Sequence, residues 1–226
     1  MIVSAKTIID RVSRQLVDIT NVVWSRSDLL EWLSVGQRLV VMLQPNATGT
    51  IATIQLTAGT RQTVPSDGWL LLEVIRNMGT NGTTPGRAIR VVSRKLLDTF
   101  NPTWHSDTKS AVVQNYLYDP QDQTGFFVYP PSNGTNYIEI NYSAIPAYLT
   151  SENQNLTVPG AYEEALTHYL MFRALSKNAA FAANPQADSY LQLFNAVLGG
   201  KVTAEQANNP NLGLMPGPSA APGGTS

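Results

Sequence analysis

The sequence has 226 residues and no cysteine, and its 15 Lys and Arg against 16 Asp and Glu give a net charge of −1. This length can bury a core without crosslinks, the missing thiols exclude a disulfide framework and cysteine nucleophiles, and the neutral balance provides no basic field for holding nucleic acid. Charged residues make up only 14 % of the chain, against roughly 25 % in soluble domains, which is either a quirk of composition or the mark of a subunit buried in an assembly.

The sequence pattern of residues 1–45 predicts two helices. Apolar residues recur at three- and four-residue steps from Ala5 to Ile19, which is typical of an amphipathic helix. Ser25 is a suitable N-cap for a second helix, which Pro45 ends. Lys6 and Asp10 interrupt the first apolar residues, and no run reaches the roughly 20 apolar residues of a membrane span. We therefore expect a soluble protein with no secretory signal and no membrane partner.

Residues 50–145 change to a period of two, which predicts β-strands. In the stretch 59–77, Gly59 and the residues 65–68 form turns, and Leu70, Leu72 and Val74 are expected to face a core. Other strands are predicted at 51–56, 87–92, 112–118, 125–129 and 136–142, and a short helix at 93–100.

The strands at 112–118, 125–129 and 136–142 are expected to form one antiparallel meander. Residues 130–134 have the turn composition that returns a hairpin. In the last strand, Ile138, Ile140 and Tyr142 lie on one face by alternation.

Helical spacing returns near the C-terminus. Pro159 suits the first turn of a third helix, and Asn184 with Pro185 begins a fourth, which Gly199 and Gly200 are expected to stop. We therefore predict an α+β fold: a four-helix bundle-like domain of residues 1–48 and 156–201, an inserted antiparallel β-rich domain of residues 49–155, and an extended Pro/Gly-rich C-terminal tail of residues 202–226.

The sequence offers few residues for chemistry. His168 is four residues after Glu164, which favours a structural hydrogen bond or ion pair, and His105 is in a loop with Ser106 and Asp107 beside it. Neither has a metal-ligand cluster or a nucleophile motif around it, and no phosphate-binding glycine motif occurs. A hydrolase acting through either histidine is the weakest hypothesis. We predict no enzyme activity, no cofactor and no metal.

Aromatic residues leave one alternative open. The segments "GFFVYPP" and "YIEINY" place aromatic rings on both faces of a sheet, where they would pack a second core, contact protein or stack on sugars. A carbohydrate-binding module that uses Phe127 or Tyr129 is therefore one hypothesis for the function.

The order of several motifs resembles a known family. Trp24 with "DLLEWLSVGQRLVV", then "GTRQTVP", "VIRNM", "FNPTWH", "FFVYPP" and "YLMFRALSKNAAFAANPQADSYLQLF", resemble the bacteriophage head-to-tail connector (adaptor) proteins beneath the portal of short-tailed phages. The resemblance implies a structural virion protein at the head-tail junction. It also implies a dodecameric ring that joins the portal protein to the tail nozzle or a tail-fibre protein, while double-stranded DNA passes through the lumen without specific binding. The alternative function in a virion is a tail-fibre attachment or carbohydrate-binding module.

Interface residues are predicted in this setting. Arginine and amide side chains offer several donors to another chain, aromatic ones offer contact area, and the tail is expected to reach along a neighbour or onto the portal. The predicted interface residues are Arg61, Gln62, Arg76, Asn77, Trp104, Arg173, Asn211, Leu212, Leu214 and Met215.

Overall fold

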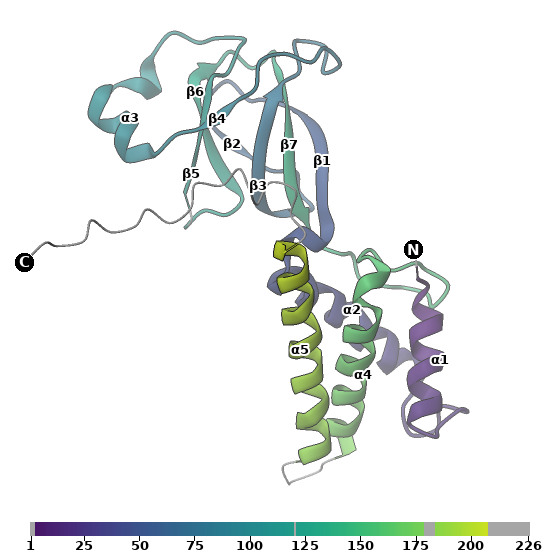
Figure 1. The fold of residues 1–226 in the computed structure, drawn as a ribbon. Helices are drawn as coiled ribbons and strands as arrows, with labels where there is room; N and C mark the ends of the chain where they lie inside the picture. The colour runs from purple at the N-terminus through teal and green to yellow at the C-terminus, as the bar shows by residue number, and fades with distance from the viewer. Residues whose placement is uncertain (1–2, 120, 179–183, 208–226) are drawn as a thin grey trace, which may run out of the picture.

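The computed structural model describes residues 3–119, 121–178 and 184–207. Helices and sheets occupy separate parts of the molecule (Figure 1). One part contains α1 (Ala5–Gln15), α2 (Arg26–Leu43), α4 (Glu163–Asn178) and α5 (Pro185–Ala207). The other contains the strands β1 to β7 and the short helix α3 (Arg94–Phe100). Each part has its own cluster of buried hydrophobic residues.

The helices begin where local signals predict them. The side chains of Ser4 and Ser25 accept hydrogen bonds from the backbone N–H groups of Thr7 and Asp28, and so cap α1 and α2. Asn184 Oδ1 accepts the N–H groups of Gln186 and Ala187 at the start of α5. The end of α5 differs from the prediction. The helix continues through Gly199 and Gly200 to Ala207, with Lys201 Nζ 4.3 Å from the ring centroid of Tyr162.

The predicted four-helix bundle-like domain is wrong. α4 is the common neighbour, since α1, α2 and α5 all pack against it. Among the described side chains of α5, only a narrow stripe is buried (Ala187, Phe194 and Leu198). This helix lies along α4, and α2 runs obliquely behind (Figure 1). The described chain is a mixed α+β fold with five α-helices and two sheets.

The strands form two sheets that bury one cluster between them. The three-stranded sheet has the order β1-β7-β3, and the four-stranded sheet has the order β2-β6-β5-β4. The strands are β1 (Gly49–Gln55), β2 (Gly59–Thr63), β3 (Gly68–Asn77), β4 (Arg90–Val91), β5 (Asn115–Tyr118), β6 (Gly125–Ser132) and β7 (Tyr137–Ala144). Both sheets contribute to the second cluster, which includes Val74 of β3, Phe126 of β6 and Ile140 of β7.

The predicted hairpin between residues 125–129 and 136–142 is wrong. β6 does pair with β5, as expected, but β7 pairs with β1 and β3 in the other sheet. Pro130 and Pro131 have no N–H group, so β6 cannot donate a backbone hydrogen bond to a hairpin partner at these two positions. The chain turns instead through Ser132, whose hydroxyl donates to Asn136 Oδ1 at 2.7 Å.

Residues 59–77 form two strands in different sheets. Gly68 N–H donates to Pro65 C=O at 2.8 Å, which confirms the predicted turn. Leu71 and Val74 are the buried apolar residues of β3, whereas Leu70 and Leu72 are half-buried. The register of β3 on β7 shifts three times, so strict alternation fails. In β7, alternation holds, and Ile138, Ile140 and Tyr142 are buried as predicted.

Candidate assembly surface

Four large apolar side chains are exposed on one short loop. The apolar loop, residues 17–23, connects α1 to α2 and exposes Val17 by 87 %, Ile19 by 73 %, Val22 by 82 % and Val23 by 51 %. Ile19 was expected to continue the face of the first helix, but α1 ends at Gln15. Neighbouring exposed apolar residues are a common mark of a protein contact.

Hydrogen bonds hold the apolar loop in place. The Asp18 carboxylate accepts the backbone N–H groups of Val22, Val23 and Trp24 at 2.9, 3.0 and 3.0 Å. The bond from Trp24 N–H, with those from Val22 and Val23, lowers the pKa of Asp18 because the N–H groups stabilise the carboxylate. Trp24 is buried, and its indole N–H donates to Ala174 C=O at 2.9 Å. The loop is therefore anchored to α4 while its apolar side chains point to solvent.

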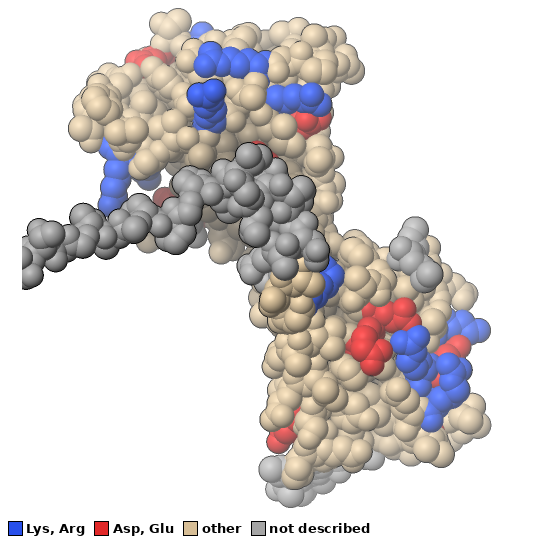
Figure 2. All heavy atoms as spheres, viewed as in Figure 1, with Lys and Arg blue, Asp and Glu red and all other residues tan. Residues whose placement is uncertain are grey.

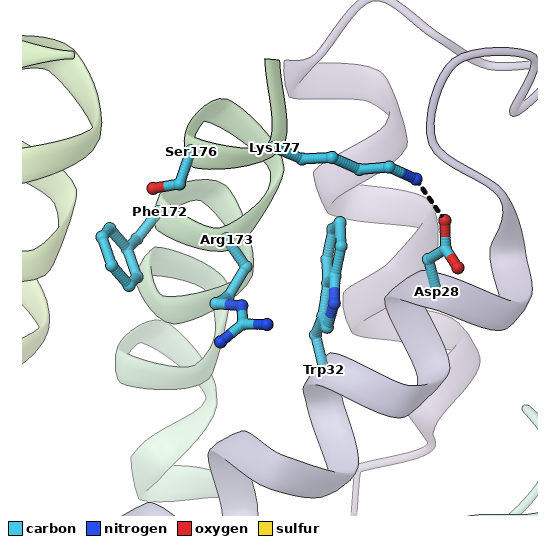
Figure 3. Close-up of a pocket in the computed structure, with 6 residues that line it drawn as sticks. All are labelled: Asp28, Trp32, Phe172, Arg173, Ser176 and Lys177. Atoms are coloured by element: carbon cyan, nitrogen blue, oxygen red, sulfur yellow. Dashed lines mark hydrogen bonds and ion pairs between the residues drawn. The ribbon is translucent and has the colours of Figure 1, made fainter. Parts of the chain in front are cut away.

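A groove lies between α2 and α4. It has a volume of about 450 Å³ and is lined by Asp28, Trp32, Phe172, Arg173, Ser176 and Lys177. Figure 3 shows the Trp32 ring lying between Arg173 and the pair formed by Lys177 and Asp28. Lys177 Nζ is 2.6 Å from Asp28 Oδ2, and this bond lowers the pKa of Asp28, helped by one from Ser25. The guanidinium carbon of Arg173 lies 5.8 Å from the Trp32 ring centroid.

The apolar loop and the groove belong to the same end of the helical part. Trp24 contacts α4 at Ala174, one residue after Arg173, and Ser25 caps the helix that supplies Asp28. In Figure 1 this end is the one farther from the sheets. The loop offers apolar side chains, and the groove offers an aromatic ring with two cations.

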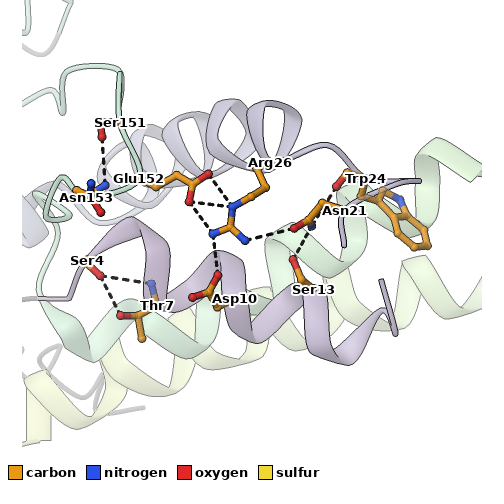
Figure 4. A network of polar contacts seen from close by, with 10 residues as sticks. All are labelled: Ser4, Thr7, Asp10, Ser13, Asn21, Trp24, Arg26, Ser151, Glu152 and Asn153. Atoms are coloured by element: carbon orange, nitrogen blue, oxygen red, sulfur yellow. Dashed lines mark hydrogen bonds and ion pairs between the residues drawn. The ribbon is translucent and has the colours of Figure 1, made fainter. Parts of the chain in front are cut away.

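A polar network fixes α1, α2 and the segment after β7 (Figure 4). Arg26 donates through Nε and Nη2 to Glu152, through Nη2 to Asp10 at 2.7 Å and through Nη1 to Asn21 Oδ1 at 3.3 Å. The bond from Arg26 lowers the pKa of Glu152, and the two carboxylates, Glu152 first, raise that of Arg26. The network supports the base of the apolar loop through Asn21, whose Nδ2 donates to Ser13 Oγ at 2.7 Å.

The predicted interface residues of β2 and β3 make contacts inside the chain. Arg61 is exposed and lies 3.0 Å from Asp122. Gln62 is buried, where Nε2 donates to Thr57 C=O and Oε1 accepts Thr57 N–H. Arg76 donates to both oxygens of Glu139, on the neighbouring strand β7.

Asn77 and Trp104 are also buried. Asn77 exchanges hydrogen bonds with the backbone of Val113 at 2.8 and 2.9 Å. Trp104 donates its indole N–H to Asp98 at 2.9 Å and stacks on His105 with ring centroids 3.7 Å apart. Of the predicted set, Arg173 belongs to the groove, and Asn211, Leu212, Leu214 and Met215 lie outside the described residues. Interface roles for the set stay predictions.

Sequence reasoning missed the apolar loop, Asp28, Trp32 and Lys177. A signal was present, because Asp18 and Asn21 are turn-forming residues that interrupt the apolar pattern after Leu16.

The histidines make structural contacts. His105 Nδ1 lies 2.8 Å from Thr60 Oγ1, while Asp107 accepts from Asn101 Nδ2 and the Tyr129 hydroxyl. His168 Nε2 lies 3.4 Å from Glu164, as the spacing predicted. Within the described ranges, no three His, Asp or Glu side chains are grouped to hold a metal ion.

The comparisons with known proteins identify the family. Residues 3–214 match the model of the SU10 adaptor protein family, which covers nearly the whole chain. A search of curated proteins found no matching sequence. None of the described helices is both long and apolar enough to cross a membrane. The match confirms the resemblance in the sequence: the chain belongs to the SU10 adaptor protein family, and it is a bacteriophage adaptor with a structural role.

Proposed function

We propose that the protein assembles into a closed ring at the head-tail junction of the virion, where it joins the portal protein to the tail nozzle and leaves a lumen for double-stranded DNA. The family match supports a place between portal and tail. The observation that carries the assembly step is the apolar loop, which is exposed although hydrogen bonds hold it firmly.

The contact between copies places the apolar loop of one copy against the groove of the next. The groove offers the Trp32 ring and Phe172 to the Val and Ile side chains of the loop. Loop and groove are different surfaces, so their contact is heterologous, and a heterologous contact generates a ring when its rotation closes. Twelve copies, the number that the family resemblance implies, is the stoichiometry that we propose.

The remaining parts of the proposal concern DNA, catalysis and domains. A net charge of −1 suits a channel for DNA, since many phosphate contacts would retain a duplex that must slide.

The structural role of the family supports a protein without enzyme activity. The separate clusters support a division into a helical domain and a β-rich domain, residues 49–155. Because α5 continues to Ala207, the helical domain comprises residues 1–48 and 156–207 in place of the predicted 156–201.

The carbohydrate-binding alternative has less support. The ring of Phe127 lies edge-on to Trp104 at 5.9 Å, and the ring of Tyr129 lies edge-on to it at 6.4 Å. These rings serve internal packing, which leaves less aromatic surface for a sugar. Loss of glycan binding in a Phe127→Ala variant would favour the alternative.

Native mass spectrometry of the full chain, alone and with the portal protein of the same phage, tests the ring. We expect one closed species for the natural chain, and smaller species for a variant with Val17→Ser, Ile19→Ser and Val22→Ser. Leu193→Ser is the control, because Leu193 is exposed by 45 % on α5 and belongs neither to the loop nor to the residues that line the groove. A triple variant that assembles like the natural chain would exclude the loop contact. A natural chain that stays monomeric with the portal would exclude the ring.

A further inference from the structure

The three-stranded sheet has a free edge. β1 lies at one end of the order β1-β7-β3 and pairs with β7 over all seven residues. Gly49 N–H donates to Asn46 C=O, and among the described residues no other backbone hydrogen bond involves residues 50–55. In an antiparallel sheet, alternate residues of an edge strand direct their N–H and C=O groups outward. The outer edge of β1 therefore presents a row of backbone groups to a further strand.

This edge lacks three common forms of protection, namely charged side chains, proline and a bulge. The sequence of β1, GTIATIQ, contains no charge and no proline, and its register on β7 runs without a bulge. In soluble proteins, charged residues, prolines and bulges normally keep an edge strand from pairing with another chain. Ile51 is exposed by 64 %, while Ala52 and Ile54 pack against the core cluster and are only half-buried. One more strand beside β1 would therefore cover Ala52 and Ile54 and complete the core at this edge.

The C-terminal sequence contains a segment that fits this edge. Residues 208–226 carry no charged side chain, so their docking depends on main-chain bonds and apolar contacts, as does that of β1. Between Pro210 and Pro216 lies the proline-free segment NLGLM, residues 211–215. Leu212 and Leu214 are two residues apart, which puts them on one face of an extended strand.

The length of the linker before this segment limits which edge it can bind. The end of α5 lies on the side of the helices that faces the sheets (Figure 1), where Lys201 contacts Tyr162 just before α4 begins. Only residues 208–210 separate the end of α5 at Ala207 from this segment, and they let Asn211 lie up to roughly 14 Å from Ala207 when extended. The β1 edge that receives the segment must therefore lie within this distance of the end of α5.

We propose that residues 211–215 of one copy bind as a fourth strand to the outer edge of β1 in the next copy of a ring. Leu212 and Leu214 then cover Ala52 and Ile54, and main-chain hydrogen bonds supply the remaining affinity, as in other cases of strand addition. The donation rests on the ring proposed above. Because each copy has one β1 edge and one such segment, donation around a closed ring leaves no β1 edge unpaired.

Disulfide cross-linking of full-length chains tests this donation, since the natural sequence has no cysteine. One chain carries Thr53→Cys and a second carries Gly213→Cys, with Ile51→Cys as an alternative acceptor position. We expect mixing under oxidising conditions to give a covalent species with the mass of two chains. Adding Leu212→Asn and Leu214→Asn to the donor should abolish it. The matched control acceptor is Thr63→Cys, an exposed position on β2 of the other sheet.

Each other outcome overturns the donation. A chain that carries both cysteines and cross-links only within itself shows that the segment binds its own edge. No cross-link at either acceptor position, in a sample whose native mass shows the ring, excludes strand donation and leaves the ring intact. No cross-link in a sample that shows no ring under any condition contradicts the proposed function as well.

Discussion

Val17 occupies the position after the C-cap of α1 where glycine is the usual residue. Val17 N–H donates to Arg14 C=O and Asp18 N–H donates to Ser13 C=O, which is the Schellman pattern, and Val17 has a φ of 57°. A β-branched residue in this region costs about 1–2 kcal/mol. The same side chain is 87 % exposed, so it contributes little to the core. Strain and exposure at one residue indicate a role in a contact with another molecule.

Replacing Val17 by Asn should therefore stabilise the monomer and weaken the ring. Asn tolerates the left-handed conformation, so we expect the free energy of unfolding to rise by about 1 kcal/mol, measured by urea denaturation. Native mass spectrometry should show less of the closed species. Val17→Ala keeps the backbone strain and removes the apolar contact, so it should weaken the ring without stabilising the monomer. An Asn variant with an unchanged ring would show that Val17 is not in the contact.

Asn77 and Arg61 should respond in opposite ways to truncation. Asn77→Ala leaves the buried N–H and C=O groups of Val113 without their side-chain partner, and we expect it to lower the free energy of unfolding by at least about 2 kcal/mol. Arg61 forms an exposed ion pair, so Arg61→Ala should cost less than about 1 kcal/mol. Thermal and urea denaturation measure both. If Asn77→Ala impairs assembly but not stability, its buried contacts are less important than the predicted interface role.

The contact between α2 and α4 depends on Gly36. A Cβ atom at this position would lie 2.8 Å from Tyr169 Cδ1 and 3.2 Å from Leu166 Cδ2. Gly36→Ala therefore forces the helices apart at a cost of about 1–3 kcal/mol, of which the better helix propensity of Ala returns up to about 1 kcal/mol. We expect a net loss of up to about 2 kcal/mol in urea denaturation.

Gly199→Ala is the matched control for Gly36. Gly199 also lies inside a helix, but a Cβ atom there would meet nothing within 4 Å. The substitution should raise stability by about 0.5–1 kcal/mol. Equal effects at the two glycines would contradict a close approach of α2 and α4.

Element boundaries could be predicted where the signal is local. Ser25 and Asn184 cap helices with their own side chains, and α2 ends at Leu43, just before Gln44 and Pro45. Features that depend on distant contacts could not be predicted. The sheet that receives β7, the register shifts of β3 and the continuation of α5 past Gly199 are decided by packing partners far away in the sequence.

At the scale of the whole molecule, α2 connects the helical part to the segment that returns from the sheets. Arg26 binds Glu152, Ser34 Oγ accepts Leu149 N–H, Gln37 Oε1 accepts Thr157 N–H, and Arg38 donates to Pro146 C=O. These contacts follow one helix over three turns. They explain why the candidate site was only partly predictable: Arg173 was found on its own helix, but the Trp32 groove exists only because α2 is fixed beside α4.

Acid should weaken this connection, because it depends on ionised carboxylates that become protonated as the pH falls. The pKa values of Glu152, Asp18 and Asp28 are lowered in the folded chain from 4.5, 3.8 and 3.8. A carboxylate with a lowered pKa stabilises the fold above its unfolded pKa, and this contribution is lost as the pH falls through the folded value, because the unfolded chain binds the proton first. We expect constant stability from pH 7 to about pH 5 and a decline below about pH 4.5.

The Arg26–Glu152 pair should account for part of that decline. Glu152→Gln removes the ion pair, so we expect it to lower stability at pH 7 by about 1 kcal/mol, a modest value because both side chains are partly exposed. The same variant should show a shallower loss between pH 5 and pH 3 in urea denaturation. Glu31→Gln is the control, since Glu31 is exposed on α2 and forms no ion pair among the described residues. An acid profile identical for both variants would mean that Glu152 does not connect the two parts of the chain.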